Sequence, residues 1–298
     1  MSLTLDTKQS PMWVGYNAER LNDYLPVQKI AYMTQIDQSS TSLSVVAETL
    51  RICQKVASEC NQPIISVTYD LAIAKMVYTI QATEAPAYDN VFIQLESYNI
   101  ELSFFKALGK FIAESGGPFI LSETEVLAGG SMKGFITGTH YNRCKRLHQL
   151  LAFAFEALHF ESFLLSIEKP SEDVIHQILT ASGDLSTLSS PLKQLLEDYE
   201  KYCDASIDGK HGMTAKYWYT YIQYMHLYKE FSRVIRTGDF DLFLYTLPQI
   251  ASIFFAFNHP NYARWLIQYH NKLLTVEDTH PTFRADLENG AFPSTCFW

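Results

Sequence analysis

Two short apolar runs separated by a helical segment constrain the fold of this chain more than any other feature. The first run, Pro63–Asp70, is rich in β-branched residues and ends in a carboxylate, and the second run covers Val91–Leu95. Between them the residue pattern predicts a helix over residues 71–81, which starts immediately after Asp70. A strand, a helix and a second strand in this order are typical of parallel pairing. We therefore expect a partly parallel sheet in the N-terminal part of the chain.

The flanking segments favour an α/β core over residues 1–118. A strand-like pattern covers residues 27–36, and apolar spacing predicts helices over residues 43–60 and 100–114. The Ser115–Pro118 turn ends this alternation, and residues 119–298 are predicted to form a mostly helical region, with a glycine-rich loop at residues 128–135. The helices expected in this region cover residues 141–167, 171–182, 190–204, 213–237, 239–257 and 260–275. The two aromatic residues at the very end suggest a chain truncated at its C-terminus.

Composition and charge limit the classes of protein to which the chain can belong. A net charge of −9 argues against a nucleic-acid-binding surface that extends over the whole chain, although it allows a local basic patch. The five cysteines are scattered without a paired motif, which indicates reduced thiols in an intracellular protein, in either the nucleus or the cytoplasm. The most membrane-like segment, Leu150–Ile167, carries Glu156, His159 and Glu161, so we expect a buried helix and no membrane partner.

Two acids at the predicted strand ends are the candidate catalytic and metal-binding residues. Asp70 follows the first strand and Glu96 follows the second. Acids at neighbouring strand ends can hold Mg²⁺ or Mn²⁺, as phosphoryl-transfer enzymes require. The alternative is structural, because Asp is a preferred N-cap and a helix is predicted to begin at Leu71. The spacing leaves both interpretations open.

One local basic patch is the candidate DNA-binding surface. Lys133 lies in the glycine-rich stretch, and Arg143, Lys145 and Arg146 follow in the next predicted helix. Such a patch could contact a phosphate backbone, whereas the structural alternative is an ordinary solvated helix face. A row of aromatic residues further along is expected to pack in a helical core rather than to stack on bases. The row comprises Tyr217, Tyr221, Tyr224, Tyr228 and Phe231.

Several stretches together resemble a known group of proteins, and the resemblance covers nearly the whole chain. The stretches are Thr68–Lys75, Ala107–Pro118, Gly130–Phe135, Asn142–Arg146 and His259–Trp265. They resemble a large group of uncharacterised invertebrate proteins that expand like mobile elements. This group is similar to a domain-of-unknown-function family with suspected descent from DDE-type transposases.

The resemblance implies a partial RNase H-like α/β fold interrupted by a large helical insertion. It matches Asp70 to the middle acid of a metal-binding triad, whose first acid would precede this chain and whose last would follow Trp298. Relatives tend to have Ser-Phe-His where this chain has Ser97-Tyr98-Asn99, which removes a titratable group near the site. The resulting hypothesis is an inactive fragment of a transposon-derived, transposase-like protein with residual metal or DNA binding. The alternative is a co-opted protein-interaction or scaffold module without catalytic activity; a hydrolase or transferase with a new site has little support.

Overall fold

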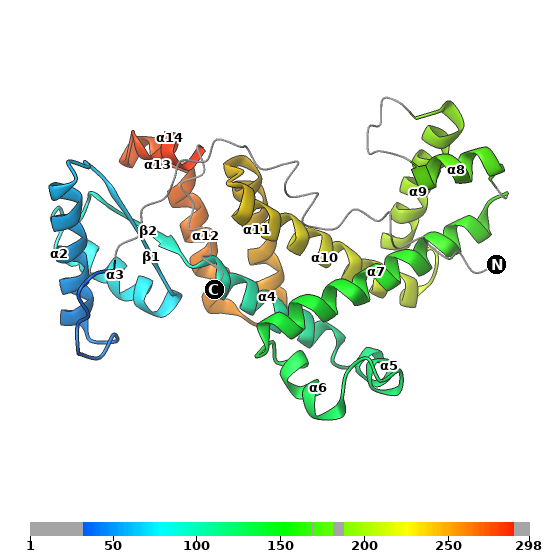
Figure 1. Cartoon of the computed structure of the whole chain (residues 1–298), viewed down its shortest axis with the longest axis horizontal. Coiled ribbons are helices and arrows are strands. Elements are labelled where there is room, and N and C mark those ends of the chain that lie inside the picture. Colours follow the sequence, from blue (N-terminus) through cyan, green and yellow to red (C-terminus); the bar gives the residue numbers. More distant parts are fainter. Residues whose placement is uncertain (1–31, 169, 181–187, 289–298) are drawn as a thin grey trace. The chain divides into compact units, whose positions relative to one another are not determined.

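The computed structural model describes residues 32–168, 170–180 and 188–288, and helices dominate this part of the chain (Figure 1). Of the described residues, 72% are helical and 4% lie in strands. The elements before residue 140 are α2 (Leu43–Glu59), β1 (Ile65–Tyr69), α3 (Leu71–Thr83), β2 (Val91–Leu95), α4 (Ser97–Ile112), α5 (Gly117–Glu123) and α6 (Gly129–Ile136). Those after residue 140 are α7 (Tyr141–Ser166), α8 (Glu172–Thr180), α9 (Ser190–Ile207), α10 (Met213–Thr237), α11 (Phe240–Ala256), α12 (Pro260–Leu274), α13 (Val276–Thr279) and α14 (Phe283–Glu288).

The prediction of an RNase H-like α/β fold is wrong. Strands β1 and β2 do pair in parallel, as the apolar runs predicted, but the sheet formed by the described residues has these two strands alone. The strand predicted at residues 27–36 is absent from its described part, residues 32–36, and the rest of it lies outside the described residues. Two strands are too few for an RNase H-like sheet, and the helices supply the remaining core.

The described residues divide into two compact units, each built from separate parts of the sequence. The first unit contains the described residues up to Ser97, the segment Arg233–Leu244 and the described residues from Tyr269 onward. The second contains Tyr98–Ser232 and Tyr245–Gln268.

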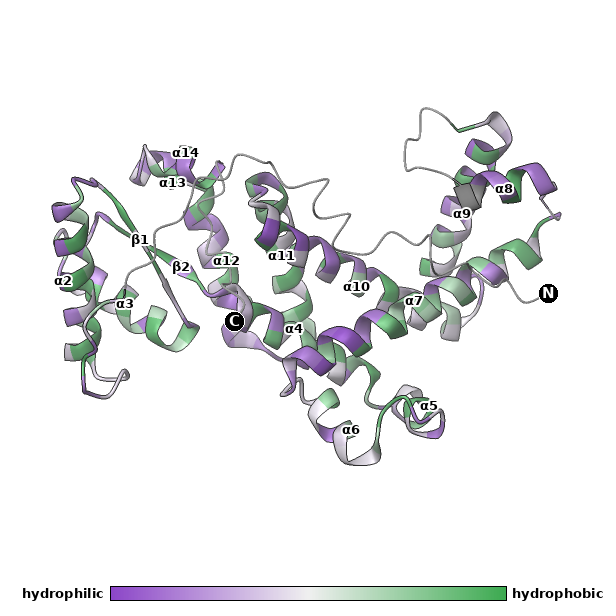
Figure 2. Cartoon of the chain, viewed as in Figure 1, coloured by the Kyte–Doolittle hydropathy of each residue, from purple (hydrophilic) through white to green (hydrophobic). Residues whose placement is uncertain are grey.

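In the first unit, helices cover both faces of the β1–β2 sheet. On one face, the hydroxyl groups of Thr49 in α2 and Tyr69 in β1 lie 2.9 Å apart. On the other face, the Phe92 ring packs against Phe283 of α14, with 4.9 Å between the ring centroids. All five residues of β2 are buried, and most of the strand is hydrophobic (Figure 2). Covering both faces explains why four of the five residues of this strand are apolar.

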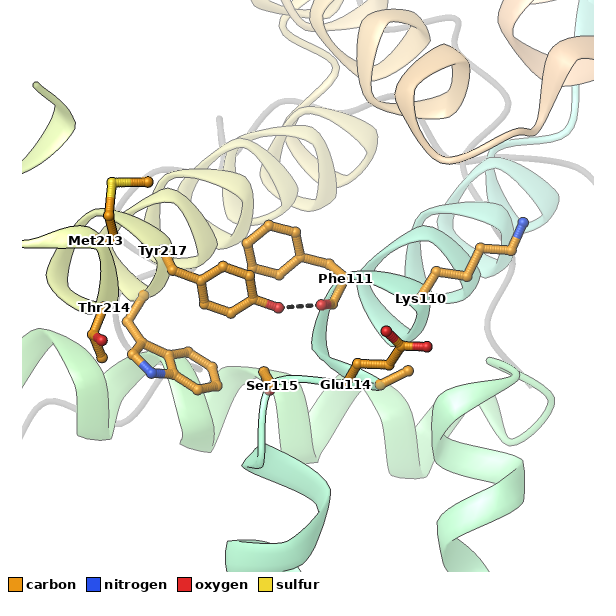
Figure 3. Close-up of a pocket in the computed structure, with 9 residues that line it drawn as sticks. Lys110, Phe111, Glu114, Ser115, Met213, Thr214 and Tyr217 are labelled. Carbon is orange, nitrogen blue, oxygen red and sulfur yellow. Dashed lines mark hydrogen bonds between the residues drawn. The ribbon is translucent and has the colours of Figure 1, made fainter. Parts of the chain in front are cut away.

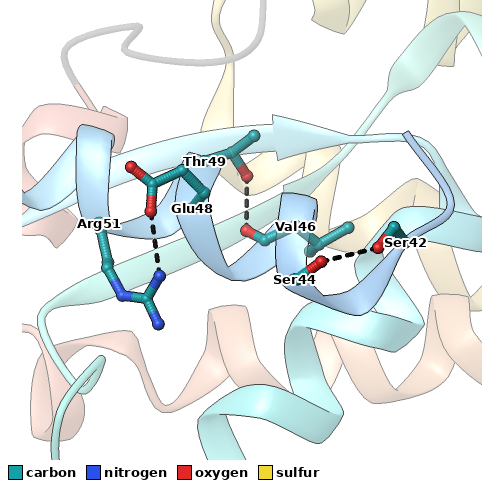
Figure 4. Close-up of polar contacts among 6 residues, drawn as sticks. All are labelled: Ser42, Ser44, Val46, Glu48, Thr49 and Arg51. Atoms are coloured by element: carbon teal, nitrogen blue, oxygen red, sulfur yellow. Dashed lines mark hydrogen bonds and ion pairs between the residues drawn. The ribbon is translucent and has the colours of Figure 1, made fainter. Parts of the chain in front are cut away.

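Helix α2 begins at Leu43, where the apolar spacing predicted a helix start, and its polar side chains bond locally (Figure 4). The Ser42 and Ser44 hydroxyl groups lie 2.9 Å apart, and the Thr49 hydroxyl donates to the Val46 carbonyl at 2.7 Å. The exposed Arg51 and Glu48 form an ion pair at 3.0 Å. Because Val46 and Leu50 are buried, α2 has the amphipathic character that the sequence predicted.

In the second unit, α4, α7 and α10 carry the central packing. The prediction that the aromatic row on α10 packs in the core is confirmed for Tyr221, Tyr228 and Phe231, which are at most 1% exposed. The other two members, Tyr217 and Tyr224, are half-buried. The glycine-rich loop prediction is wrong, because Gly129–Ile136 forms α6. A Cβ atom on Gly109 of α4 would lie 1.9 Å from the Ile136 carbonyl oxygen, so this glycine permits α6 to approach α4 closely.

Candidate functional site

Asp70 and Glu96 follow paired strand residues, as the sequence predicted. Tyr69 lies opposite Leu95 in the parallel register, so the next residue of each strand lies at the same end of the sheet. The backbone N–H of Glu96 donates to the Tyr69 carbonyl at 3.1 Å. The Asp70 carboxylate accepts a hydrogen bond from the Ile73 backbone N–H at 2.8 Å and caps α3. Asp70 therefore has the structural role that the sequence left open.

The metal-binding role of these acids stays a prediction. Asp70 is exposed and Glu96 is half-buried, and the two carboxylates are fewer than a three-acid centre requires. Among the described residues, no group of three or more His, Cys, Asp or Glu side chains is arranged to hold a metal ion. Two carboxylates suit Mg²⁺ when waters or phosphate oxygens complete its coordination.

The residues of the predicted basic patch have different environments. Lys133 on α6 and Arg143 and Arg146 on α7 are exposed. The side chain of Lys145 is 17% exposed, and its Nζ atom lies 3.8 Å from the carboxylate of Glu101. Three of the four cations are thus accessible to a polyanion, whereas Lys145 forms an ion pair with an interior acid.

Glu101 is the centre of a buried polar cluster that joins α4, α7 and α10. Its side chain is 1% exposed and accepts hydrogen bonds from the hydroxyl groups of Tyr141, at 2.5 Å, and Tyr228, at 3.0 Å. Lys145 Nζ also donates to the Tyr141 hydroxyl at 3.1 Å. Burial, together with the negative charge of Glu101, raises the pKa of Tyr228 far above its usual range. We call Glu101, Tyr141, Lys145 and Tyr228 the Glu101 cluster.

His148 is a second interior polar group beside the same helices. It is fully buried, its ring stacks on Phe105 with 5.6 Å between the centroids, and its Nδ1 atom lies 2.8 Å from the Tyr221 hydroxyl. Its Nε2 atom is buried without a hydrogen-bond partner among the described residues. Burial lowers the pKa of His148 to about 3, so the ring is neutral at physiological pH.

An open groove lies between the end of α4 and the beginning of α10 (Figure 3). Its volume is about 710 Å³. The Phe111 and Tyr217 rings stack with 4.3 Å between centroids, and Trp218 meets Tyr217 edge-on at 5.2 Å. The Tyr217 hydroxyl donates to the Phe111 carbonyl, and Met213 at the rim is 74% exposed. We call this feature the α4–α10 groove.

Two charged side chains line the α4–α10 groove: Lys110 on α4 and Glu114 in the turn after α4. Lys110 extends away from the aromatic rings, and its Nζ atom donates to the Phe257 carbonyl at 2.8 Å (Figure 3). Glu114 is exposed at the rim. An aromatic wall with an exposed methionine and few charged groups is suited to holding an apolar side chain of a partner.

Sequence reasoning missed both the Glu101 cluster and the α4–α10 groove. Glu101 shares one face of α4 with Phe104, Phe105 and Leu108, all buried, so an acid on an apolar face was the available signal. The groove joins residues about one hundred positions apart in sequence, and no local pattern reveals that proximity.

Comparison with protein families assigns the chain to a group. A family model described as a domain of unknown function, DUF8702, matches residues 12–294. The chain belongs to the DUF8702 family. No curated protein and no solved structure matches it. Family membership confirms the predicted likeness to an uncharacterised domain family.

Within the described ranges, none of the helices combines the length and the apolar composition that a membrane span needs. This includes α7, which contains the most membrane-like part of the sequence.

Proposed function

We propose that this DUF8702 chain is a protein-interaction module whose α4–α10 groove receives an apolar side chain of a partner protein. The observation that carries the proposal is the half-buried aromatic wall of Phe111, Tyr217 and Trp218, which lines the open groove beside the exposed Met213. Aromatic and methionine side chains are enriched in protein interfaces because they bury much area with little loss of conformational freedom.

The neighbouring helix α5 supports the proposal. It begins two residues after Ser115 at the groove, and it exposes Phe119 and Ile120, which are 68% and 53% exposed. Large apolar side chains clustered at an accessible surface are typical of interaction sites in soluble proteins. An interface centred on the groove could therefore extend onto α5.

The test compares two variants that introduce a glutamate at two different exposed positions. Met213→Glu places a charge at the rim of the groove, and Phe255→Glu places it on α11, where Phe255 is 77% exposed. Each variant and the wild type are used as bait in a lysate of cells that express the protein. We expect at least one protein to bind the wild type and Phe255→Glu directly and reproducibly, and to be lost with Met213→Glu. If every bound protein treats the two variants alike, the groove is not the binding site.

A second candidate function is contact with a phosphate backbone, and the exposure of Lys133, Arg143 and Arg146 favours it. A transposon-derived origin, suggested by the sequence resemblance alone, would be consistent with residual DNA binding. Titration of duplex DNA with wild type and with Arg143→Ala/Arg146→Ala tests it. We expect the double variant to bind more weakly and with a smaller salt slope, by about 0.9 for each lost phosphate contact. Equal affinity and equal salt slope would reject phosphate contact.

Residual metal binding at Asp70 and Glu96 is tested separately by calorimetric titration with Mg²⁺ or Mn²⁺. Because Asp70 also caps α3, Asp70→Asn is a better variant than Asp70→Ala: Asn is an equally good N-cap but lacks the charge that a hard cation requires. Heat of binding that disappears in Asp70→Asn supports the site. Binding that survives, or that is absent from the wild type, rejects it.

A further inference from the structure

Helix α7 is apolar on two opposite faces, which is unusual for a helix with one face in solvent. Its inner face packs in the core through Cys144, His148, Ala152 and Phe163, each at most 1% exposed. Its outer face exposes Leu150 and Phe153, at 52% and 63%. Large apolar side chains that cluster on an exposed surface are typical of interaction sites. The outer face of α7 is therefore expected to have a partner.

The exposed outer residues follow helical spacing and form one continuous stripe. Steps of three and four residues keep side chains on one face of a helix. We call this set the α7 stripe, and all six of its members are exposed: Arg146, Leu150, Phe153, Ala154, Ala157 and Glu161. From Arg146 to Glu161 the stripe is about 22 Å long, at 1.5 Å per residue. Figure 2 shows hydrophobic residues recurring along α7 between its more polar stretches.

The charges of the α7 stripe are arranged so that the stripe complements itself. The base Arg146 lies toward one end and the acid Glu161 toward the other, with the apolar residues between them. If a second α7 runs antiparallel across a two-fold axis between Phe153 and Ala154, Arg146 of each copy lies opposite Glu161 of the other. The same register sets Leu150 opposite Ala157, which places a large side chain against a small one. A two-fold contact of this kind repeats every pairing twice.

We propose that two copies of this chain associate through antiparallel pairing of their α7 stripes, with Arg146 of each copy bonded to Glu161 of the other. This inference goes beyond partner binding at the α4–α10 groove, because it uses another face of the second unit and another occupant. The contact is a single helix pair, smaller than a standard interface, so association in the micromolar range is expected.

Charge reversal tests both the contact and its register. We measure the association of wild type, Arg146→Glu, Glu161→Arg and the double variant by sedimentation equilibrium across the micromolar range. Each single reversal creates two like-charge contacts per dimer, and because these contacts are exposed it should weaken association only about tenfold. The double variant restores both pairs with reversed sign and should recover the wild-type affinity.

Phe153→Glu tests the apolar centre, and Phe255→Glu is the matched control. Phe153 and Phe255 are 63% and 77% exposed, so neither variant should disturb the fold, which circular dichroism checks. We expect Phe153→Glu to be monomeric and Phe255→Glu to associate like the wild type. A wild type that is monomeric throughout, association that survives Phe153→Glu, or failure of the double charge reversal to restore association would overturn the proposal. Binding of monomeric wild type to lipid vesicles through Phe153 would do so as well, because the stripe would then face a membrane surface.

Discussion

Helices α4 and α10 meet in two places with opposite properties. Near the start of α4, Glu101 is enclosed with Tyr228 of α10, and each side-chain oxygen or nitrogen atom of that cluster has a polar partner. Near the end of α4, Phe111 meets Tyr217 of α10 at an open groove. A closed and satisfied polar cluster specifies how helices pack, whereas an open aromatic surface leaves binding energy for another molecule. The same helix pair thus has a closed region, which should govern stability, and an open region, to which we assign the proposed partner binding.

The largest expected effect is on stability and comes from Glu101→Gln. The amide accepts at one atom and donates at the other, so it cannot accept from both tyrosines and also balance the charge of Lys145. We expect the free energy of unfolding to fall by about 3–5 kcal/mol, as when one partner of a buried ion pair is removed. Urea denaturation measures it. Glu114→Gln makes the same chemical change on the exposed rim and should stay within about 0.5 kcal/mol of wild type. Equal effects of both would remove the distinction between the two regions.

The fold should lose stability in acid because of the buried His148, which lies in the interior near the Glu101 cluster. Its pKa is about 3 in the folded protein, below the usual 6.5, so the unfolded state binds the proton more readily. The contribution of neutral His148 is complete above pH 6.5 and is lost as the pH falls from 6.5 toward 3. The loss amounts to about 3 kcal/mol at pH 4, at 1.36 kcal/mol per pKa unit. In His148→Gln, which cannot titrate but keeps a polar group for Tyr221, this part of the acid sensitivity should disappear from the pH dependence of unfolding.

Tyr228→Phe sharpens the comparison by removing one hydrogen bond to Glu101. The carboxylate keeps Tyr141 and Lys145, so we expect a loss of about 2 kcal/mol. In the double variant Glu101→Gln/Tyr228→Phe, the loss in the free energy of unfolding should be smaller than the sum of the two single losses, because both changes act on the same hydrogen bond. Strict additivity in urea denaturation would show that the cluster does not act as one network.

The smallest effect on stability is expected from a substitution of Met213 at the rim of the α4–α10 groove. With 74% of its surface exposed, Met213→Ser should leave the thermal midpoint within about 2 °C of wild type, since such surface changes usually cost less than 0.5 kcal/mol. The same variant should reduce partner binding at the α4–α10 groove. A marked loss of stability would mean that Met213 supports the fold and that the groove is less open than its exposed residues indicate.

Much of the local structure could be predicted from the sequence. The second strand is confirmed at Val91–Leu95, and α10 is confirmed at Met213–Thr237. Both segments have strong apolar patterns, of strand type and helix type respectively. The observed start of α12 at Pro260 agrees with the preference of proline for the first turn of a helix.

The fold class could not be predicted, because two good strands do not determine how many more exist. The short helices α5 and α6 begin with glycine residues, which have low helix propensity, so local pattern favoured turn and loop. Of the candidate sites, the sequence placed Asp70 and Glu96 at neighbouring strand ends, and the parallel register of β1 and β2 agrees with that placement. It did not predict that Lys145 would face Glu101, because that contact depends on how α4 and α7 pack.

The contact between Gly109 and Ile136 has a consequence for how sequences of this family can change. A side chain at Gly109 would overlap the backbone of α6, and replacing Ile136 by another residue does not move its carbonyl oxygen. Compensation therefore requires a backbone shift of α6 rather than a second point substitution. Gly109 should consequently be among the last positions at which DUF8702 sequences diverge, and a member that lacks it should also carry an insertion or deletion near α6.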